Sequence, residues 1–427
     1  MTELASDTLT PPEPSFGNGS LPGDRPDRQR RRRRSQRLRR GRRIMLAVGV
    51  VVALLITTAL VGAATSPGNE SYSAKLADWL RSHHASALVT PVESWYYQSQ
   101  APTKGGRPQA LNALPPAAPT TTAPPATPSV PAPPIVGPLP SAVTPHLPPP
   151  ANLPLVVSPA LPGEGQWQAV GPLVHGRPGM YEAQFRADST YTSQITSAVW
   201  IDPKALALSL VPGSREPGGS WSEPPDLSGP AEAAALAAFN GGFRFADAHG
   251  GFYLDGRQAV PLRDGAASVV ISADGKVDIG AWGSEVSMKP GVKAVLQNLV
   301  PIVDHGQPAP SATYKDASIW GTTVRTATVV PRSGLGVTAN GGLVYVAGPA
   351  LTALTLAESL QRAGAVRAMA LDLNPEWVTF NFFNHTDPSG ATTATKLYPS
   401  MRRPAERYLG PTSESRDFFV VSQPPSS

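Results

Sequence analysis

Cysteine is absent from the 427 residues of this chain. Its absence excludes disulfide bonds, thiolate nucleophiles and cysteine-based zinc or iron–sulfur sites. The sequence also lacks a Gly-x-Ser-x-Gly nucleophile elbow, a P-loop and a His-Glu-x-x-His zinc motif. We therefore expect no metal and no cofactor, so any catalysis has to rest on other polar side chains.

Positive charge is scarce outside the N-terminal tail. Residues 1–43 hold 12 arginines against five acidic residues, which leaves 24 basic and 26 acidic residues of the totals of 36 and 31. This composition predicts a disordered, Arg-rich cytoplasmic tail. The rest of the chain has no basic field that would attract nucleic acid, and no nucleic acid is expected as a partner.

A single long apolar run follows the arginines. Residues 44–64 carry no charged side chain, and ~20 apolar residues suffice to cross a bilayer as a helix. The arginines before the run predict a cytoplasmic N-terminus and an extracytoplasmic C-terminal domain. We expect a single-pass protein of the cell membrane, with membrane lipid around this anchor. The alternative is a signal peptide cleaved near Ala63-Ala64-Thr65-Ser66.

Two segments follow the anchor. Residues 70–100 place Leu76, Trp79, Leu80 and His83 at helical spacing, which predicts a juxtamembrane amphipathic helix on the outer membrane surface or a packed helical stalk. Residues 101–163 hold 20 of the 49 prolines and little charge. That composition is typical of an extended, disordered linker that does not bury a core.

The remaining residues, 164–421, suffice for one globular domain. Runs of β-branched and aromatic residues flank the turns Asp255-Gly256, Asp274-Gly275 and Asn340-Gly341, which predicts three hairpins. Residues 292–300 and 355–363 are expected to be helical, the second with a capping box from Thr355 to Glu358. The predicted fold class is α+β, a strand-rich mixed-sheet domain with a few helices, preceded by one transmembrane helix and a disordered Pro-rich stalk.

The turn Asn240-Gly241-Gly242-Phe243 is the first candidate element of a site. It ends an apolar run, and two glycines without a Cβ leave their backbone N–H groups accessible to a ligand. The Asn240 amide can donate and accept hydrogen bonds at once. The alternative is a tight turn without further function.

Two charged residues are the next candidates. Arg332 begins the stretch Arg332-Ser333-Gly334-Leu335-Gly336, and its planar guanidinium suits phosphate oxygens. Arg325 is a competing choice for this role. Asp372 follows the apolar run 366–371, where a carboxylate can serve as nucleophile, general base or structural cap.

Taken in this order, the three pieces resemble the phosphodiester glycosidase family of the uncovering-enzyme type, whose N-acetylglucosaminidase domain releases N-acetylglucosamine from a phosphodiester. That family has Asn-Gly-Gly/Thr-Phe-Phe, then Arg-Thr-Ala-x-Gly, then Asp-Gly-Gly-Gly-Ser. The chain matches the first piece with Arg244 in place of the second aromatic, and it matches the second piece at Arg332. The third piece matches only at Asp372, because Leu373-Asn374-Pro375 replaces the glycines. The resemblance covers roughly residues 167–421.

The resemblance implies a role for each matching residue. Gly241 and Gly242 would hold a phosphate together with Arg332, Asn240 would orient the sugar, and Asp372 would act as acid, base or nucleophile. Glycosidases generally use two carboxylates, and the choice of the second stays open among Glu376, Asp247 and Asp255. Trp377 is expected to stack on a sugar ring, and the loop residue His249 has an intrinsic pKa suited to proton transfer.

Two functions stay open from the sequence. The first is a membrane-anchored extracytoplasmic hydrolase of glycosyl-phosphodiester bonds in envelope glycans. The second is a catalytically inactive envelope protein that uses the same fold to bind glycan or a protein partner. The replaced glycines after Asp372 favour the second, since proline stiffens the loop and side chains block close approach to its backbone.

Overall fold

The structure is a computed structural model that describes residues 25–100, 102–115, 146–313, 317–320, 329–385, 390–411 and 413–424. The chain divides into two units, Met1–Val61 and Gly62–Ser427. Each unit is described by itself.

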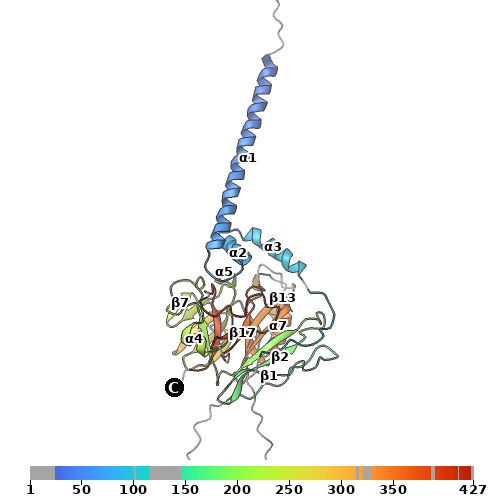
Figure 1. Cartoon of the computed structure of the whole chain (residues 1–427), viewed down its shortest axis with the longest axis vertical. Helices are drawn as coiled ribbons and strands as arrows, with labels where there is room; N and C mark the ends of the chain where they lie inside the picture. The colour runs from blue at the N-terminus through green and yellow to red at the C-terminus, as the bar shows by residue number, and fades with distance from the viewer. Residues whose placement is uncertain are drawn as a thin grey trace, which may run out of the picture. The chain divides into compact units, whose positions relative to one another are not determined.

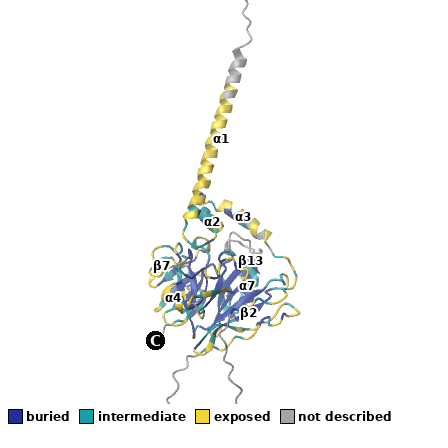
Figure 2. Cartoon of the chain, viewed as in Figure 1, coloured by how far each residue is buried: buried dark blue, intermediate teal, exposed yellow. Residues whose placement is uncertain are grey.

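The long helix α1, Arg25–Thr65, contains the predicted membrane span. Within the described residues, this helix is the one that is long and apolar enough to cross a bilayer, over Gln36–Thr65. Its side chains are exposed along most of its length (Figure 2). The length and composition of this helix fit a membrane anchor, and they fit a signal sequence equally well.

Two helices, not one, form where residues 70–100 were expected to be a single amphipathic helix. Helix α2 spans Tyr72–Ser82 and α3 spans Ser86–Ser99. The Ser71 side chain caps α2 by accepting a hydrogen bond from the Ala74 N–H at 3.3 Å. At the other end the His83 ring stacks on Trp79 at 3.8 Å.

An eight-stranded sheet is the largest element of the domain, with strand order β1-β2-β3-β14-β13-β15-β11-β12 (Figure 1). Its strands in chain order are β1 Gln168–Val174, β2 Arg177–Phe185, β3 Thr196–Ile201, β11 Pro301–Asp304, β12 Gln307–Pro308, β13 Val330–Thr338, β14 Leu343–Leu351 and β15 Ala365–Ala370.

Two five-stranded sheets complete the strand content. The first has the order β7-β6-β10-β8-β9 and consists of β6 Phe252–Leu254, β7 Arg257–Val260, β8 Ala267–Ser272, β9 Val277–Ala281 and β10 Val292–Gln297. The second has the order β17-β16-β5-β18-β4 and consists of β4 Ala207–Val211, β5 Ala235–Asn240, β16 Phe380–Asn384, β17 Thr393–Lys396 and β18 Phe418–Ser422.

The prediction of a strand-rich α+β domain is confirmed. The sheets, however, are antiparallel and not mixed. Every pair of these named strands is antiparallel, and parallel pairing in the described residues is limited to two isolated bridges. All three predicted hairpins form, as β6–β7, β8–β9 and β13–β14. Their turns work because Gly256, Gly275 and Gly341 adopt positive φ angles.

The helix expected over residues 292–300 is wrong, because Val292–Gln297 is the strand β10 between β6 and β8. A short apolar run buried on both faces has no strand periodicity to distinguish it from a helix. The second expected helix exists as α7, Ala353–Arg362, but its capping box joins Thr352 to Thr355 and starts three residues earlier. The other short helices are α4 Gly229–Ala234, α5 Phe245–Ala248, α6 Ala317–Trp320 and the 3-10 helix Pro310–Thr313.

The main core lies between the three sheets and unites residues such as Leu335 of β13, Phe239 of β5 and Val269 of β8. On its other face, the eight-stranded sheet packs against α7 through Leu356 and Leu360. Figure 2 shows these strands as the buried interior of the domain. Because each sheet has a buried face on this core, the ends of their strands are held in fixed positions.

Both ends of the expected Pro-rich linker contact the domain. The Asn112 N–H donates to Gln184 at 2.8 Å, the Leu147 N–H donates to Asp202 at 2.9 Å, and Arg186 donates to the Pro159 carbonyl at 2.8 Å. Residues 116–145, between these ends, lie outside the described part of the chain. The division at residue 164 stays a prediction, and residues 102–115 and 146–163 pack as part of the same unit.

Candidate functional site

Four strands bring the candidate residues together, three of them at their ends. Asn240 is the last residue of β5, Ser333 lies in β13, Asp372 follows β15 by two residues, and Asp417 directly precedes β18. β5 and β18 pair so that Asn240 lies opposite Phe418. Side chains from two different sheets therefore meet at one end of the main core.

Asn240 is buried and fully engaged at this meeting point. Its Nδ2 donates to the Gly241 carbonyl at 2.8 Å and to Ser333 Oγ at 3.1 Å. Its Oδ1 accepts from the Tyr345 hydroxyl at 3.1 Å and from the Thr379 N–H at 3.2 Å. A buried amide with this set of partners positions the strands that surround it.

Ser333 connects Asn240 to Asp372. The Asp372 N–H donates to Ser333 Oγ at 3.2 Å, and the Ser333 N–H donates to the Asp372 carbonyl at 2.8 Å. The first and third sequence pieces are thus linked by two successive hydrogen bonds, through the serine of the second piece. No sequence pattern predicted a separate role for Ser333.

Asp372 is buried, with 2% of its surface exposed, although it lies in the loop that follows β15. Its Oδ1 accepts from the N–H groups of Leu373 and Asn374 at 2.7 and 2.8 Å, and its Oδ2 lies 3.5 Å from Arg416 Nη1. Burial raises the pKa of Asp372 to about 6, although Arg416 and the two N–H groups lower it. The carboxylate therefore caps its own loop and also faces a cation.

Arg416 joins the site to helix α2. Its guanidinium lies 3.5 Å from Asp372 and 3.4 Å from Asp78 of α2, and it covers the ring of Trp377 at 3.9 Å. Asp78 also lies 3.6 Å from Arg244, next to the Asn-Gly-Gly turn. The Asp78 carboxylate is therefore held between two arginines of the domain, and Figure 1 shows α2 beside α5 at this place.

Asp417 is a buried carboxylate that the sequence analysis missed. Its Oδ2 has no hydrogen-bond partner among the described residues. Burial raises the pKa of Asp417 to about 7, with a further contribution from Glu216. The Gly241 N–H donates to the Asp417 carbonyl at 3.2 Å, so this group lies against the Gly-Gly turn. A carboxyl with a pKa near neutrality is suited to proton transfer.

Arg332 lies apart from this cluster. Adjacent residues of a strand point to opposite faces, so Arg332 and Ser333 face different sides of the sheet. Arg332 Nε donates to the Leu351 carbonyl at 3.0 Å, and its buried Nη2 has no partner among the described residues. Burial lowers the pKa of Arg332 to about 10. Its phosphate role remains a proposal, and the competing Arg325 lies outside the described residues.

Glu376 and Trp377 belong to a neighbouring network of charges. Glu376 Oε1 accepts from Arg403 at 3.1 Å and from the Ser71 N–H at 2.9 Å, while Oε2 is buried without a partner in the described part of the chain. Trp377 is 3% exposed beneath Arg416. A sugar can stack on this ring only if the arginine moves away.

His249 and the other candidate carboxylates are peripheral. His249 is exposed at the end of α5 with a φ angle of 51°, and within the described residues no hydrogen bond or ion pair joins its side chain to Asn240 or Asp372. Asp247 and Asp255 are also exposed, the second at a hairpin turn. In place of these residues, the structure puts Arg416 beside Asp372 and Asp417 beside Gly241. The available sequence signal was an Arg-Asp pair directly before the apolar strand 418–421.

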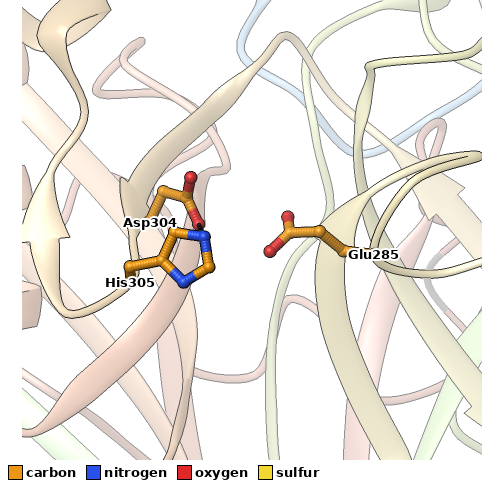
Figure 3. Close-up of side chains that lie close together, drawn as sticks. All are labelled: Glu285, Asp304 and His305. Atoms are coloured by element: carbon orange, nitrogen blue, oxygen red, sulfur yellow. Dashed lines mark ion pairs between the residues drawn. The ribbon is translucent and has the colours of Figure 1, made fainter.

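A different cluster contains potential metal ligands. Glu285, Asp304 and His305 have ligand atoms within 4.8 Å of one another (Figure 3). However, Glu285 already accepts a hydrogen bond from the Ala281 N–H at 2.7 Å and lies 3.9 Å from Arg367. The His305 side chain is 87% exposed. These contacts account for the cluster as surface ion pairing, and we assign no metal to it.

Comparison with known families identifies the class. Residues 233–372 match the model of the phosphodiester glycosidase family. This match begins just before β5 and ends at Asp372, so it spans the three motifs that suggested the family. The resemblance stated from the sequence is thereby confirmed, and this region is similar to the phosphodiester glycosidase family.

Individual proteins are more distant. A solved structure of the zebrafish N-acetylglucosamine-1-phosphodiester alpha-N-acetylglucosaminidase catalytic domain, auto-inhibited by its pro-peptide, is 15% identical, covers 61% of this chain and 88% of that chain, and gives a TM-score of 0.38. A hypothetical protein from Synechocystis is 12% identical, covers 60% and 64%, and scores 0.35. A putative exported protein from Burkholderia pseudomallei is 10% identical, covers 54% and 74%, and scores 0.32. No curated protein matches the chain.

Proposed function

We propose that this chain is a membrane-anchored, extracytoplasmic hydrolase of glycosyl-phosphodiester bonds in envelope glycans. The family match supports the reaction class, and the apolar helix preceded by arginines supports the anchor. The observation that carries the proposal is the meeting of Asn240, Asp372, Arg416 and Asp417 at neighbouring strand ends.

In this proposal the two buried aspartates share the chemistry. Asp372, paired with Arg416, is the anionic member and acts on the anomeric carbon or on the attacking water. Asp417, whose pKa lies near 7, transfers a proton to the phosphate oxygen that leaves. Water adds across the sugar–oxygen bond, so the products are a free sugar and a phosphate monoester. Glu376 is kept as the alternative second carboxylate because its Oε2 has no described partner.

The phosphate would lie between Arg416 and Arg244, next to the Gly241–Gly242 backbone. The Asp78 carboxylate now holds that position, with both arginines within 3.6 Å. An acidic side chain between two guanidiniums has the charge and the oxygen geometry of a bound phosphodiester. Substrate binding therefore requires α2 to withdraw Asp78, and Arg416 would leave the Trp377 ring at the same time.

The competing function is a catalytically inactive protein that binds glycan or a protein partner. The environment of Asp372 favours the inactive protein, because two backbone N–H groups of its own loop occupy Asp372 Oδ1. The loop also contains Pro375, where the family has flexible glycines. In this version Arg416 and Arg244 still bind a phosphodiester, and no sugar is released.

The test uses the full-length protein in detergent and a synthetic N-acetylglucosamine phosphodiester. Released sugar is measured together with the melting temperature, for the wild type, Asp417→Asn and Arg416→Lys. Asp255→Asn, at an exposed turn, is the matched control. Asp417→Asn is the informative change because amide and protonated carboxyl have the same shape, so the fold should tolerate it.

The hydrolase predicts at least about a hundredfold loss of turnover in Asp417→Asn with a nearly unchanged melting temperature. Arg416→Lys should raise KM, since lysine keeps the charge but loses the planar fork. The inactive binder predicts no sugar release from any variant and weaker ligand binding in Arg416→Lys. Unchanged turnover in Asp417→Asn would remove this residue from the mechanism.

A further inference from the structure

Helices α2 and α3 enclose a pocket of about 450 Å³ on the surface of the domain. Leu76 and Leu80 of α2 line one side, and Leu88, Val92 and Trp95 of α3 line the other. This volume lies within the range of small-molecule pockets, which is roughly 300–1,000 Å³. The pocket walls consist mainly of apolar carbon atoms with few polar atoms, so they suit a hydrocarbon and not a sugar.

The α3 side of the pocket is open to the surroundings. Leu88, Val92 and Trp95 are 69, 64 and 69% exposed, and their spacing of i, i+4 and i+7 puts them on one face of the helix. A contiguous exposed apolar stripe marks a surface that contacts apolar material. Tryptophan at its end is typical of the membrane interface.

The position of the pocket in the chain indicates where this apolar material comes from. Six residues, 66–71, separate the end of α1 from the start of α2. An extended chain of this length spans at most about 21 Å. If α1 is the membrane anchor of the proposed function, α2 and α3 begin at the bilayer surface, within reach of lipid.

The inner end of the pocket is polar and adjoins the candidate site. Asn374 and Glu376 line it, and the Asn374 N–H donates directly to Asp372 at 2.8 Å. Arg402 adds an exposed cation at the rim, 2.7 Å from the Tyr96 hydroxyl. The pocket thus runs from an apolar, outward-facing wall to a cation and then to the loop of the candidate carboxylate.

We propose that this pocket binds the hydrocarbon chain of the substrate, which is a lipid-linked glycosyl phosphodiester. The inference rests on the proposed function and adds its substrate class. A single long-chain molecule fits the whole arrangement: its tail lies against Leu80 and Val92, and its glycosyl phosphate extends past Arg402 toward the Asp372 loop. Bulk phospholipid would use only the apolar half of the pocket.

The experiment compares two probes with the same glycosyl phosphate, one esterified with a long alkyl chain and one with methyl. Full-length protein in nanodiscs of neutral lipid binds each probe, and a photoreactive group in the alkyl chain reports its place by mass spectrometry. Ala77→Phe fills the pocket, and Val92→Glu puts a charge in its wall. Val156→Glu is the matched control, at a valine that is 47% exposed outside these helices.

The expected result is at least about tenfold tighter binding of the long-chain probe, since each buried methylene contributes to affinity. Cross-links should fall in α2 and α3, and both pocket variants should lose the preference while Val156→Glu keeps it. Equal binding of the two probes, cross-links elsewhere, or α3-to-α3 cross-links between two copies would overturn the proposal.

Binding and turnover separate this inference from the proposed function. Localised long-chain binding without sugar release would support the lipid pocket and contradict the hydrolase function. Equal hydrolysis of the methyl and long-chain probes, with no preference in binding, would support the hydrolase function and contradict the lipid pocket.

Discussion

The Asp417 carboxylate occupies the space where a side chain of Gly241 would be. A Cβ on Gly241 would overlap Asp417 Oδ2 and lie 2.7 Å from the Asp417 carbonyl oxygen. Gly241 has no left-handed backbone angle to explain its identity, so the requirement for glycine here is one of close approach. The Asn-Gly-Gly turn is therefore part of the packing around a buried acid as well as a candidate ligand contact.

Gly241→Ala should lower the free energy of unfolding by about 1–3 kcal/mol, the usual cost of overpacking a filled site. Chemical denaturation of both proteins measures the difference. The double variant Gly241→Ala/Asp417→Ala should recover part of the loss, because one of the two clashing groups is gone. A simple turn without this contact would show additive effects of the two changes.

Asp372→Asn should be destabilising by about 1–3 kcal/mol, because Asp372 is buried beside Arg416. The amide still accepts from Leu373 and Asn374 but no longer neutralises the buried Arg416. Thermal unfolding at pH 7.5 checks this, with Asp255→Asn as the exposed control. An unchanged melting temperature would mean that Asp78 alone suffices to balance Arg416.

Glu182 on β2 should make stability depend on pH. Burial raises the pKa of Glu182 from 4.5 to about 7, although Gln184 and Ser197 hydrogen bonds lower it. The folded chain therefore holds this proton more tightly than the unfolded chain. Its contribution to stability is complete below pH 4.5 and is lost as the pH rises to about 7 and above.

Glu182→Gln should consequently stabilise the protein at pH 8, by on the order of 3 kcal/mol, and have little effect at pH 5. Melting temperatures across this pH range provide the measurement, and Glu406→Gln, at an exposed glutamate, is the control. If both variants follow the wild-type curve in parallel, Glu182 is not the source of the pH dependence.

Limited proteolysis should cut between residues 116 and 145, because this segment is rich in proline and almost free of charge. The two products should remain associated after cleavage, since Asn112 and Gln184 exchange two hydrogen bonds at 2.8 and 3.3 Å. Size-exclusion chromatography followed by denaturing gels detects this. Separation of the products under native conditions would show that the 102–115 segment does not hold the two products together.

A reporter fused after Ser427 should be active only outside the cytoplasm. The arginine run precedes the candidate span Gln36–Thr65, and cationic flanks are retained on the cytoplasmic side. Paired reporters that work on opposite sides of the membrane measure the orientation. An N-terminal sequence of the mature protein beginning near Ser66 would identify the helix as a cleaved signal and reject the anchor.

Local sequence patterns predicted most of the strand content. The three hairpins have Asp-Gly or Asn-Gly turns, whose conformations match the twist of the strands they join, so a short segment determines each of them. Residues 292–300 show the limit of this approach. Their apolar run is a central strand because β6 and β8 flank it, and the sequence of the segment itself does not contain that information.

The placement of the candidate residues was predictable where they lie on strands that carry a motif. Asn240 and Asp372 meet through Ser333, as their shared membership in a family pattern suggested. Arg332 was selected because its planar guanidinium suits phosphate and because the family pattern matches there, but strand alternation turns it away from Ser333. Arg416 and Asp417 were missed because their place depends on the pairing of β18 with β5, which no local pattern reveals.

The order of these pieces limits which parts can be exchanged between relatives. The family match stops at Asp372, whereas Arg416 and Asp417 come from β18 and its approach, and Asp78 comes from α2. A chimera that grafts residues 233–372 alone into another scaffold would carry one buried aspartate without its arginine. A protein therefore has this charge arrangement only if it contains the whole unit from α2 to β18. Functional relatives have to be compared over this entire unit.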